Sequence, residues 1–250
     1  MSFPIFEDDE SIKADWKQAL RPEFGNNENF YKILSEKIEK MYNTNGRAKS
    51  DSVYPRNRHD IFQAFKLTSF QNTRVVILGE EPYQSKAAHG LSFSVNPKAN
   101  IADIPPSLKN IFNELENDND VDFETPSTTC LKTWADQGVL LLNTRLTLGI
   151  KNLRWQKFID AVIRILNDEH SKRVVFVFLG KKAVKKRKII INAPEKHKIL
   201  LASHPSDQGF KQNLTENGRE IAKPFFNSHL FSKANNFLKE KGIPLIDWRL

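Results

Sequence analysis

The sequence is poor in cysteine. Cys130 is the only one among 250 residues, so the chain cannot form an internal disulfide and has no Cys-x-x-Cys pair to hold zinc or a cluster. Cys130 could be read as a nucleophile, but a free cysteine is far more often a small, half-buried residue, here at the start of a helix. This composition fits a reducing compartment, which is the cytoplasm, or the nucleus in a eukaryotic or viral source.

Long hydrophobic runs are also missing. No apolar stretch approaches the roughly 20 residues that a membrane-spanning helix needs. The first ten residues are acidic and contain no basic segment followed by an apolar stretch. We therefore expect neither a secretory signal nor a membrane partner.

Several cofactor and catalytic motifs are absent as well. The sequence contains no Gly-x-Gly-x-x-Gly after a strand, no Walker lysine loop and no Gly-x-Ser-x-Gly elbow. Its six histidines are scattered, and only His204 stands at the end of a predicted strand. These absences argue against nucleotide-dependent, serine-hydrolase and metal-hydrolase classes, and we expect no cofactor and no metal.

What the sequence does have is positive charge. Its formal net charge is +8 and its pI is about 9.4. Such an excess favours a polyanionic partner, because lysine and arginine neutralise phosphates and release counterions. Many basic proteins bind no nucleic acid, so the charge gains meaning only beside a recognisable site.

Four short apolar runs punctuate the chain, at residues 74–79, 138–142, 173–180 and 198–203. Continuous rather than alternating apolarity is typical of strands that are buried on both faces, and hence parallel. Helical patterns lie between or after these runs, at residues 58–69, 106–117, 128–137, 152–169, 181–192 and 223–241. The pattern predicts an α/β fold, a three-layer α/β/α sandwich with a short four-stranded, mainly parallel central sheet.

The N-terminal part reads differently. Residues 10–43 predict two amphipathic helices, broken at residues 21–25, and a polar loop follows at residues 43–52. We expect a single domain over residues 1–250, with residues 1–50 as a helical extension packed on it.

Polar residues follow the predicted strands. Functional loops of parallel sheets emerge at the carboxyl ends of the strands. The segments found there are 80–83 (Glu-Glu-Pro-Tyr), 143–144 (Asn-Thr), 180–182 (Gly-Lys-Lys) and 204–206 (His-Pro-Ser). Their convergence at one edge of the sheet predicts a site.

A family resemblance rests on these segments. Residues 79–84 (Gly-Glu-Glu-Pro-Tyr-Gln) and 88–95 (Ala-His-Gly-Leu-Ser-Phe-Ser-Val) resemble the water-activating loop of family 1 uracil-DNA glycosylases, which usually reads Gly-Gln-Asp-Pro-Tyr-His and then Ala-His-Gly-Leu-x-Phe-Ser-Val. Three more matches follow in order, a proline-rich loop (104–110), a base-reading strand (138–144) and the start of a DNA-intercalating loop (204–206), and residues 244–248 resemble the C-terminal end. The resemblance implies a DNA glycosylase that flips a base into a pocket and hydrolyses its glycosidic bond.

The resemblance implies roles residue by residue. Glu81 orients the attacking water and stabilises the cationic sugar, while His204 donates a hydrogen bond to the departing base. Phe93 stacks on the base, Asn143 reads its Watson–Crick edge, Tyr83 excludes a methyl group at carbon 5, and the backbone at Glu80 reaches the O2 oxygen. Each of these residues, taken alone, is more often a core, turn or hydrogen-bonding residue.

The remaining implied residues contact DNA through hydroxyl, backbone or ring groups, and the partner is single- or double-stranded DNA bound by a monomer. They are Ser94, Pro105, Pro106, Ser107, Ser206, Gln208 and Phe210. The basic run at 181–188 is either part of this face, a nuclear signal or simply a solvated helix face.

The chain departs from the family pattern on its DNA side. Glu80-Glu81 replaces Gln-Asp, and the longer side chain moves the carboxylate by about 1.5 Å, one C–C bond. Gln84 replaces a histidine, the segment 148–155 is short, and the loop after His204 lacks the wedge leucine, so Gln208 or Phe210 must fill the stack. Three hypotheses follow: excision of uracil, excision of a modified base such as a hypermodified phage cytosine in antiviral defence, or a DNA-binding scaffold with little activity.

Overall fold

The central sheet has four parallel strands. The computed structural model describes residues 3–98, 104–149, 153–168, 173–190 and 196–250. Its strands are β1 (Val75–Gly79), β2 (Val139–Asn143), β3 (Val175–Leu179) and β4 (Lys198–Ala202), in the order β2-β1-β3-β4. Every residue of β1, β2 and β3 is buried, as the continuous apolar runs require. The predicted strands and the α/β fold class are confirmed, but β4 lies at the edge of the sheet and is only partly buried, contrary to the prediction of burial on both faces.

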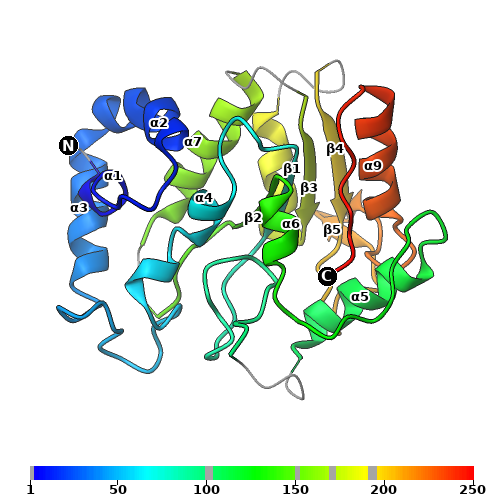
Figure 1. Cartoon of the computed structure of the whole chain (residues 1–250), viewed down its shortest axis with the longest axis horizontal. Helices are drawn as coiled ribbons and strands as arrows, with labels where there is room; N and C mark the ends of the chain where they lie inside the picture. Colours follow the sequence, from blue (N-terminus) through cyan, green and yellow to red (C-terminus); the bar gives the residue numbers. More distant parts are fainter. Residues whose placement is uncertain (1–2, 99–103, 150–152, 169–172, 191–195) are drawn as a thin grey trace.

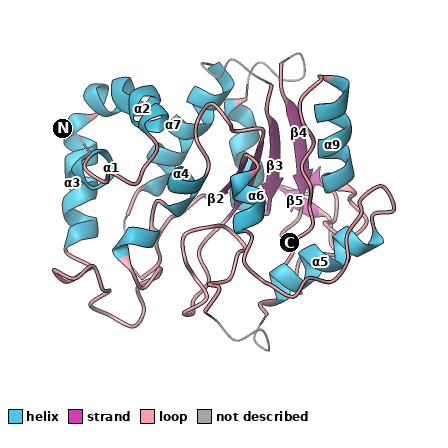
Figure 2. Cartoon of the chain, viewed as in Figure 1, coloured by secondary structure: helices cyan, strands magenta, loops and turns pink. Residues whose placement is uncertain are grey.

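Helices cover both faces of this sheet (Figures 1 and 2). α7 (Trp155–Asp168) lies on one side, and α6 (Lys132–Asp136) and α9 (Leu230–Glu240) lie on the other. α9 contacts β3 and β4, whereas α6 contacts β2. Because the four strands are parallel, their carboxyl ends and the loops that follow them lie at one edge of the sheet.

The N-terminal helices share the main core. They are α1 (Pro4–Glu7), α2 (Ala14–Asn26) and α3 (Glu28–Glu39). Phe6 packs edge-on against Phe62 with ring centroids 5.0 Å apart, and Phe3 lies 5.6 Å from Phe158 of α7. These aromatic contacts join the first 40 residues to the helix that covers the sheet.

The predicted helix break at residues 21–25 is wrong. α2 continues through Pro22 and ends at Asn26, and the backbone leaves the helical region at Asn27. An interior proline costs a hydrogen bond, but α2 buries Trp16, Leu20 and Phe24 on one face, and the Trp16 indole donates to the carbonyl of Thr68 at 2.8 Å. Tertiary packing therefore outweighs the local signal.

The other helices follow the sequence pattern to different degrees. The prediction for 106–117 coincides with α5 (Pro106–Asn117), and residues 58–69 form η1 (Arg58–Asp60) and α4 (Gln63–Leu67). Residues 181–189 form two short helices, α8 (Lys181–Val184) and η3 (Lys185–Ile189), while residues 191 and 192 lie outside the described part.

The predicted helix at 223–241 begins too early. α9 starts at Leu230, because Asn227 and His229 adopt left-handed conformations just before it. Upstream, the antiparallel hairpin β5 (Leu214–Glu216) and β6 (Arg219–Ala222) was not predicted. Its turn is Asn217-Gly218, both with positive φ, which is a recognised sequence signal for a tight hairpin.

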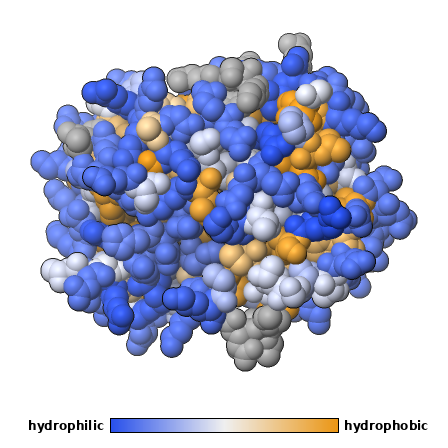
Figure 3. Space-filling view, viewed as in Figure 1, coloured by the Kyte–Doolittle hydropathy of each residue, from blue (hydrophilic) through white to orange (hydrophobic). Residues whose placement is uncertain are grey.

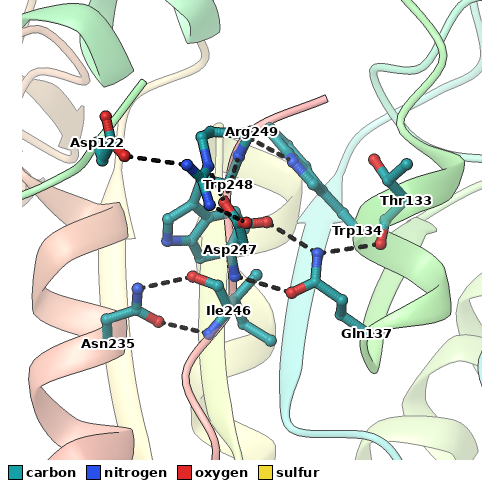
Figure 4. A network of polar contacts seen from close by, with 9 residues as sticks. All are labelled: Asp122, Thr133, Trp134, Gln137, Asn235, Ile246, Asp247, Trp248 and Arg249. Carbon is teal, nitrogen blue, oxygen red and sulfur yellow. Dashed lines mark hydrogen bonds and ion pairs between the residues drawn. The ribbon is translucent and has the colours of Figure 1, made fainter. Parts of the chain in front are cut away.

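A C-terminal segment ties α6 to α9 (Figure 4). Asn235 of α9 exchanges two hydrogen bonds with the backbone of Ile246, at 2.8 and 2.9 Å. Trp134 of α6 donates to the carbonyl of Trp248 at 2.8 Å, and the buried Trp248 ring packs against Trp134 and Phe231. The last residues therefore stabilise one helical layer.

The molecular surface is largely polar on the face drawn in Figure 3, where small hydrophobic areas lie between hydrophilic side chains. Large apolar side chains that are exposed in the described part are Ile33, Phe226 and Leu245. None of the described helices is long and apolar enough to cross a membrane.

Candidate active site

The loops that follow β1, β2 and β4 surround one small cavity. Its volume is about 110 Å³, well below the roughly 300–1,000 Å³ of pockets for drug-sized ligands. The cavity is therefore of a size that suits a ligand with a single ring. Its lining residues are Glu81, Pro82, Tyr83, Ala88, Gly90, Leu91, Phe93, Ser107, Asn143, Leu146 and His204.

A glycine leaves room for two of the side chains that line the cavity. Gly79 ends β1 directly beside Asn143 of β2. A Cβ at Gly79 would lie 2.6 Å from Oδ1 of Asn143 and 2.8 Å from Cζ of Phe93. Because Gly79 has no side chain, the Asn143 amide and the Phe93 ring can approach the turn. Within the described part of the chain the Asn143 amide makes no hydrogen bond, so its donor and acceptor remain available.

Tyr83 is held against the backbone of Phe93. Its hydroxyl donates to the carbonyl of Phe93 at 2.8 Å, and burial raises the pKa of the phenol. Phe93 itself has a left-handed backbone with φ of 61°. Such a conformation is unusual for a bulky residue and is typical of positions held by their surroundings for function.

His204 is held as a hydrogen-bond donor. Its Nδ1 accepts from the backbone N–H of Ser206 at 3.1 Å, so a neutral ring carries its proton on Nε2. Burial lowers the pKa of His204; Glu80 opposes this and Lys182 assists it. The ring lies 5.7 Å from that of Phe93. A neutral imidazole with its proton on Nε2 can donate a hydrogen bond to a developing anion without carrying a positive charge.

The two glutamates of the turn are both paired. Glu80 accepts the backbone N–H of Lys182 at 2.9 Å through Oε1. Glu81 Oε1 lies 3.2 Å from Nη1 of Arg145 and 2.5 Å from Nζ of Lys182. Partial burial would raise the pKa of Glu81, but the hydrogen bonds from Lys182 and Arg145 outweigh it and lower the pKa. Glu81 is therefore ionised at neutral pH.

The expected DNA-contacting residues fall into different environments. Ser107 lines the cavity, Pro105 and Ser206 are half-buried, and Pro106 and Gln208 are exposed. Phe210 is half-buried, and its ring packs edge-on against Phe226 with centroids 6.2 Å apart.

The expectation for Ser94 needs correction. Its hydroxyl has no exposed surface, is hydrogen-bonded to Nε2 of His89 at 2.7 Å and accepts the Leu131 N–H at 2.9 Å. Both bonds lie within the core, so in this structure Ser94 cannot reach a phosphate. It supports the loop that carries Phe93 instead.

The sequence matches a known protein family. The family model of the uracil DNA glycosylase superfamily matches residues 65–239. The chain belongs to the uracil-DNA glycosylase superfamily.

Similar proteins span most of the chain. The uracil-DNA glycosylase of Bacillus cereus (strain AH187) is 39% identical over 246 residues, which is 96% of this chain and 97% of that protein. The uracil-DNA glycosylase of Haemophilus influenzae (strain PittEE) is 41% identical over 82% of this chain and 88% of that protein. The crystal structure of mimivirus uracil-DNA glycosylase superposes with a TM-score of 0.77 at 26% identity, covering 96% of this chain and 88% of the viral one.

Arg145 was not predicted as part of the site, and Lys182 was predicted only within the strand-end segment 180–182, without a role of its own. Arg145 directly follows the Asn-Thr pair at the end of β2, so its place at a strand end was a usable signal. Lys182 was hidden in a basic run whose members have separate partners, since Lys185 pairs with Glu216 and Lys186 with Asp160. No cluster of metal-ligating side chains is found among the described residues.

Proposed function

We propose that this protein removes uracil from DNA by flipping the base into the 110 Å³ cavity and hydrolysing its N-glycosidic bond. The observation that carries the proposal is the convergence on that cavity of an aromatic ring, a free amide, a neutral imidazole donor and an ionised carboxylate. DNA, single- or double-stranded, is the partner expected from the family. The protein would act as a monomer, since the cavity is lined by residues of one chain.

Base recognition rests on three side chains. Phe93 stacks on the flipped ring, and the Asn143 amide pairs with the uracil edge, donating to a carbonyl oxygen and accepting from the ring N–H. Tyr83 stands where a substituent on carbon 5 would project. Because its hydroxyl is bonded to the Phe93 carbonyl, moving it would cost that bond, which favours uracil over thymine and over bulky modified cytosines.

The chemistry needs no metal. The bond between sugar C1′ and the base nitrogen breaks, and its electron pair leaves with the base. His204 donates from Nε2 to the uracil O2 oxygen as negative charge grows there, and the backbone at Glu80 adds a second donor. Glu81 stabilises the positive sugar and orients a water whose oxygen bonds to C1′, and the water's proton passes to the carboxylate and then to solvent.

Residues around the cavity contact the DNA backbone and the base stack. Ser107, Pro105 and Pro106 meet the backbone on one side of the flipped nucleotide, and Ser206 meets it on the other. Gln208 is exposed on the loop after His204, whereas Phe210 is packed against Phe226. Gln208 is therefore the better candidate to enter the vacated base stack.

One assay tests the proposal. The protein is incubated with single- and double-stranded oligonucleotides that carry U, T, C or modified cytosines, and with glucosylated phage DNA, and alkali-labile abasic sites are counted. Cleavage confined to U is the expected result. Cleavage confined to modified DNA would instead identify a modified-base glycosylase. Tight, salt-sensitive binding without any cleavage would indicate a scaffold.

A further inference from the structure

The glutamate turn is bracketed by cations from both neighbouring strands. β1 lies between β2 and β3 in the sheet, so its exit turn is flanked by the loops after these two strands. Arg145 comes from the β2 side and Lys182 from the β3 side. Thr144 Oγ1 and the Arg145 N–H also donate to the Glu80 carbonyl, at 2.8 and 3.1 Å, so the β2 loop is fastened to the turn.

Both cations contact the same oxygen of Glu81. Nη1 of Arg145 and Nζ of Lys182 lie 3.2 and 2.5 Å from Oε1, and no hydrogen bond to Oε2 is found in the described part of the chain. Glu81 is longer than aspartate by one methylene group, which adds a rotatable bond. Two donors on one oxygen limit that rotation and leave the second oxygen for a water molecule.

Lys182 also contacts Glu80, the second glutamate of the turn. Its N–H is hydrogen-bonded to Oε1 of Glu80, and its Nζ lies 3.8 Å from Oε2. Glu80 and His204 both lie beside Gly180: a Cβ added to Gly180 would be 2.6 Å from Oε1 of Glu80 and 3.1 Å from Cδ2 of His204. Without Lys182 the Glu80 carboxylate would favour a protonated His204, which is the wrong state for binding a growing anion as a neutral donor.

We propose that Arg145 and Lys182 are positioning residues that hold Glu81 by one carboxylate oxygen, and that Lys182 also offsets Glu80 beside His204. The inference rests on the proposed glycosylase function and explains how a turn with two glutamates can serve it. The charged groups that face the pair are Arg145 and Lys182 around Glu81, and Glu80 and Lys182 around His204.

The test measures kcat, KM and their pH profiles on a uracil-containing oligonucleotide for Arg145→Gln, Lys182→Gln, Lys182→Arg and the pair Glu80→Gln/Lys182→Gln. We expect kcat to fall on the order of 10²-fold in both single Gln variants with KM changed much less, as for a misplacement of about 1 Å. The acid midpoint should move to higher pH in both, because Glu81 retains its proton more readily, and in Lys182→Gln His204 does so as well. Lys182→Arg should restore most of the activity.

The double variant separates the two roles of Lys182. Removing the charge of Glu80 together with Lys182 should reverse the part of the midpoint shift that comes from His204. The part that comes from Glu81 should remain and kcat should stay low, because Glu81 is still held by one cation only. Lys185→Gln is the matched control: it removes the same charge from the same run but pairs with Glu216, and its midpoint should equal that of the wild type. Thermal unfolding of every variant identifies any that fail to fold.

A second readout does not need catalysis. The carboxyl carbon of Glu81, observed by NMR in protein labelled with ¹³C-glutamate and assigned with Glu81→Gln, should titrate at higher pH in Arg145→Gln and Lys182→Gln. An unchanged titration and kcat within twofold of the wild type would overturn the inference. If the wild type removes no uracil but the titration shifts as expected, the proposed function fails and the pairing of Glu81 stands.

Discussion

The backbone N–H of Ser206 donates to Nδ1 of His204 at 3.1 Å. This bond assigns the ring proton to Nε2 in the neutral state, and burial lowers the pKa from its usual value of 6.5. Nε2 of this cavity-lining residue is therefore a donor in the neutral ring. An imidazole in this state stabilises an anion through a hydrogen bond rather than by protonating it.

Replacing His204 by alanine should reduce kcat for uracil excision by a factor on the order of 10²–10³, the usual cost of losing one preorganised donor. Affinity for DNA carrying a non-cleavable uracil analogue should stay within a few-fold, because phosphate contacts supply most of the binding. Single-turnover kinetics and a binding titration check the two parts separately. A parallel loss of affinity would mean that His204 mainly shapes the DNA surface.

Replacing Glu81 by glutamine keeps the side chain's size but removes its charge. We expect excision to fall by roughly 10²–10⁴, the range that a positioned acid–base group contributes. The wild-type rate should also fall at acid pH, where Glu81 and His204 become protonated, and stay level through neutral pH because both have lowered pKa values. Full activity in Glu81→Gln would remove the role assigned to the carboxylate.

Gly79→Ala should damage the base pocket without touching a catalytic group. The added Cβ would lie 2.6 Å from Oδ1 of Asn143 and 2.8 Å from Cζ of Phe93, so both must move. We expect a large loss of kcat/KM on uracil. Gly25→Ala is the matched control, since nothing lies within 4 Å of its Cβ inside α2; it should keep activity and gain about 0.5–1 kcal/mol in unfolding free energy.

His89 makes folding sensitive to acid. Burial lowers its pKa from 6.5 to about 4, so between these values the unfolded chain binds a proton that the folded chain refuses. Stability is therefore full above about pH 6.5 and decreases as the pH falls toward 4, by about 3 kcal/mol from 1.36 kcal/mol per pKa unit. Urea unfolding at several pH values should show this slope, and His89→Gln should flatten it. Equal slopes in the two proteins would contradict the assignment.

Trp248 tests the C-terminal segment. Trp248→Ala should cost about 3–5 kcal/mol of unfolding free energy, because the ring is buried between Trp134 and Phe231. Its indole N–H is buried and has no hydrogen-bond partner in the described part of the chain. Trp248→Phe removes that unpaired donor and should cost much less. Chemical unfolding measures both, and equal losses would contradict the expectation that the phenylalanine ring keeps most of the packing.

Several features could be read from the chain alone because their causes are local. The runs at 74–79 and 173–180 are apolar and rich in β-branched and aromatic residues, so they predict buried strands wherever they lie in the fold. The turn after the first of these and the asparagine after the second apolar run lie at strand ends, which places them at one edge of a parallel sheet. The Asn217-Gly218 hairpin was also readable in this way and was missed.

Other features were decided only by tertiary structure. α2 continues through Pro22 because distant residues bury its apolar face, and the Ser94 hydroxyl is held inside by hydrogen bonds with His89 and with the backbone N–H of Leu131. The pairing of Glu81 with Arg145 and Lys182 depends on the strand order β2-β1-β3-β4. This order brings Glu81 next to Arg145, which is 64 positions away in the sequence, and next to Lys182, which is 101 positions away. Local sequence determines which residues can carry charge or form a strand, but strand order and packing determine which of those charges meet.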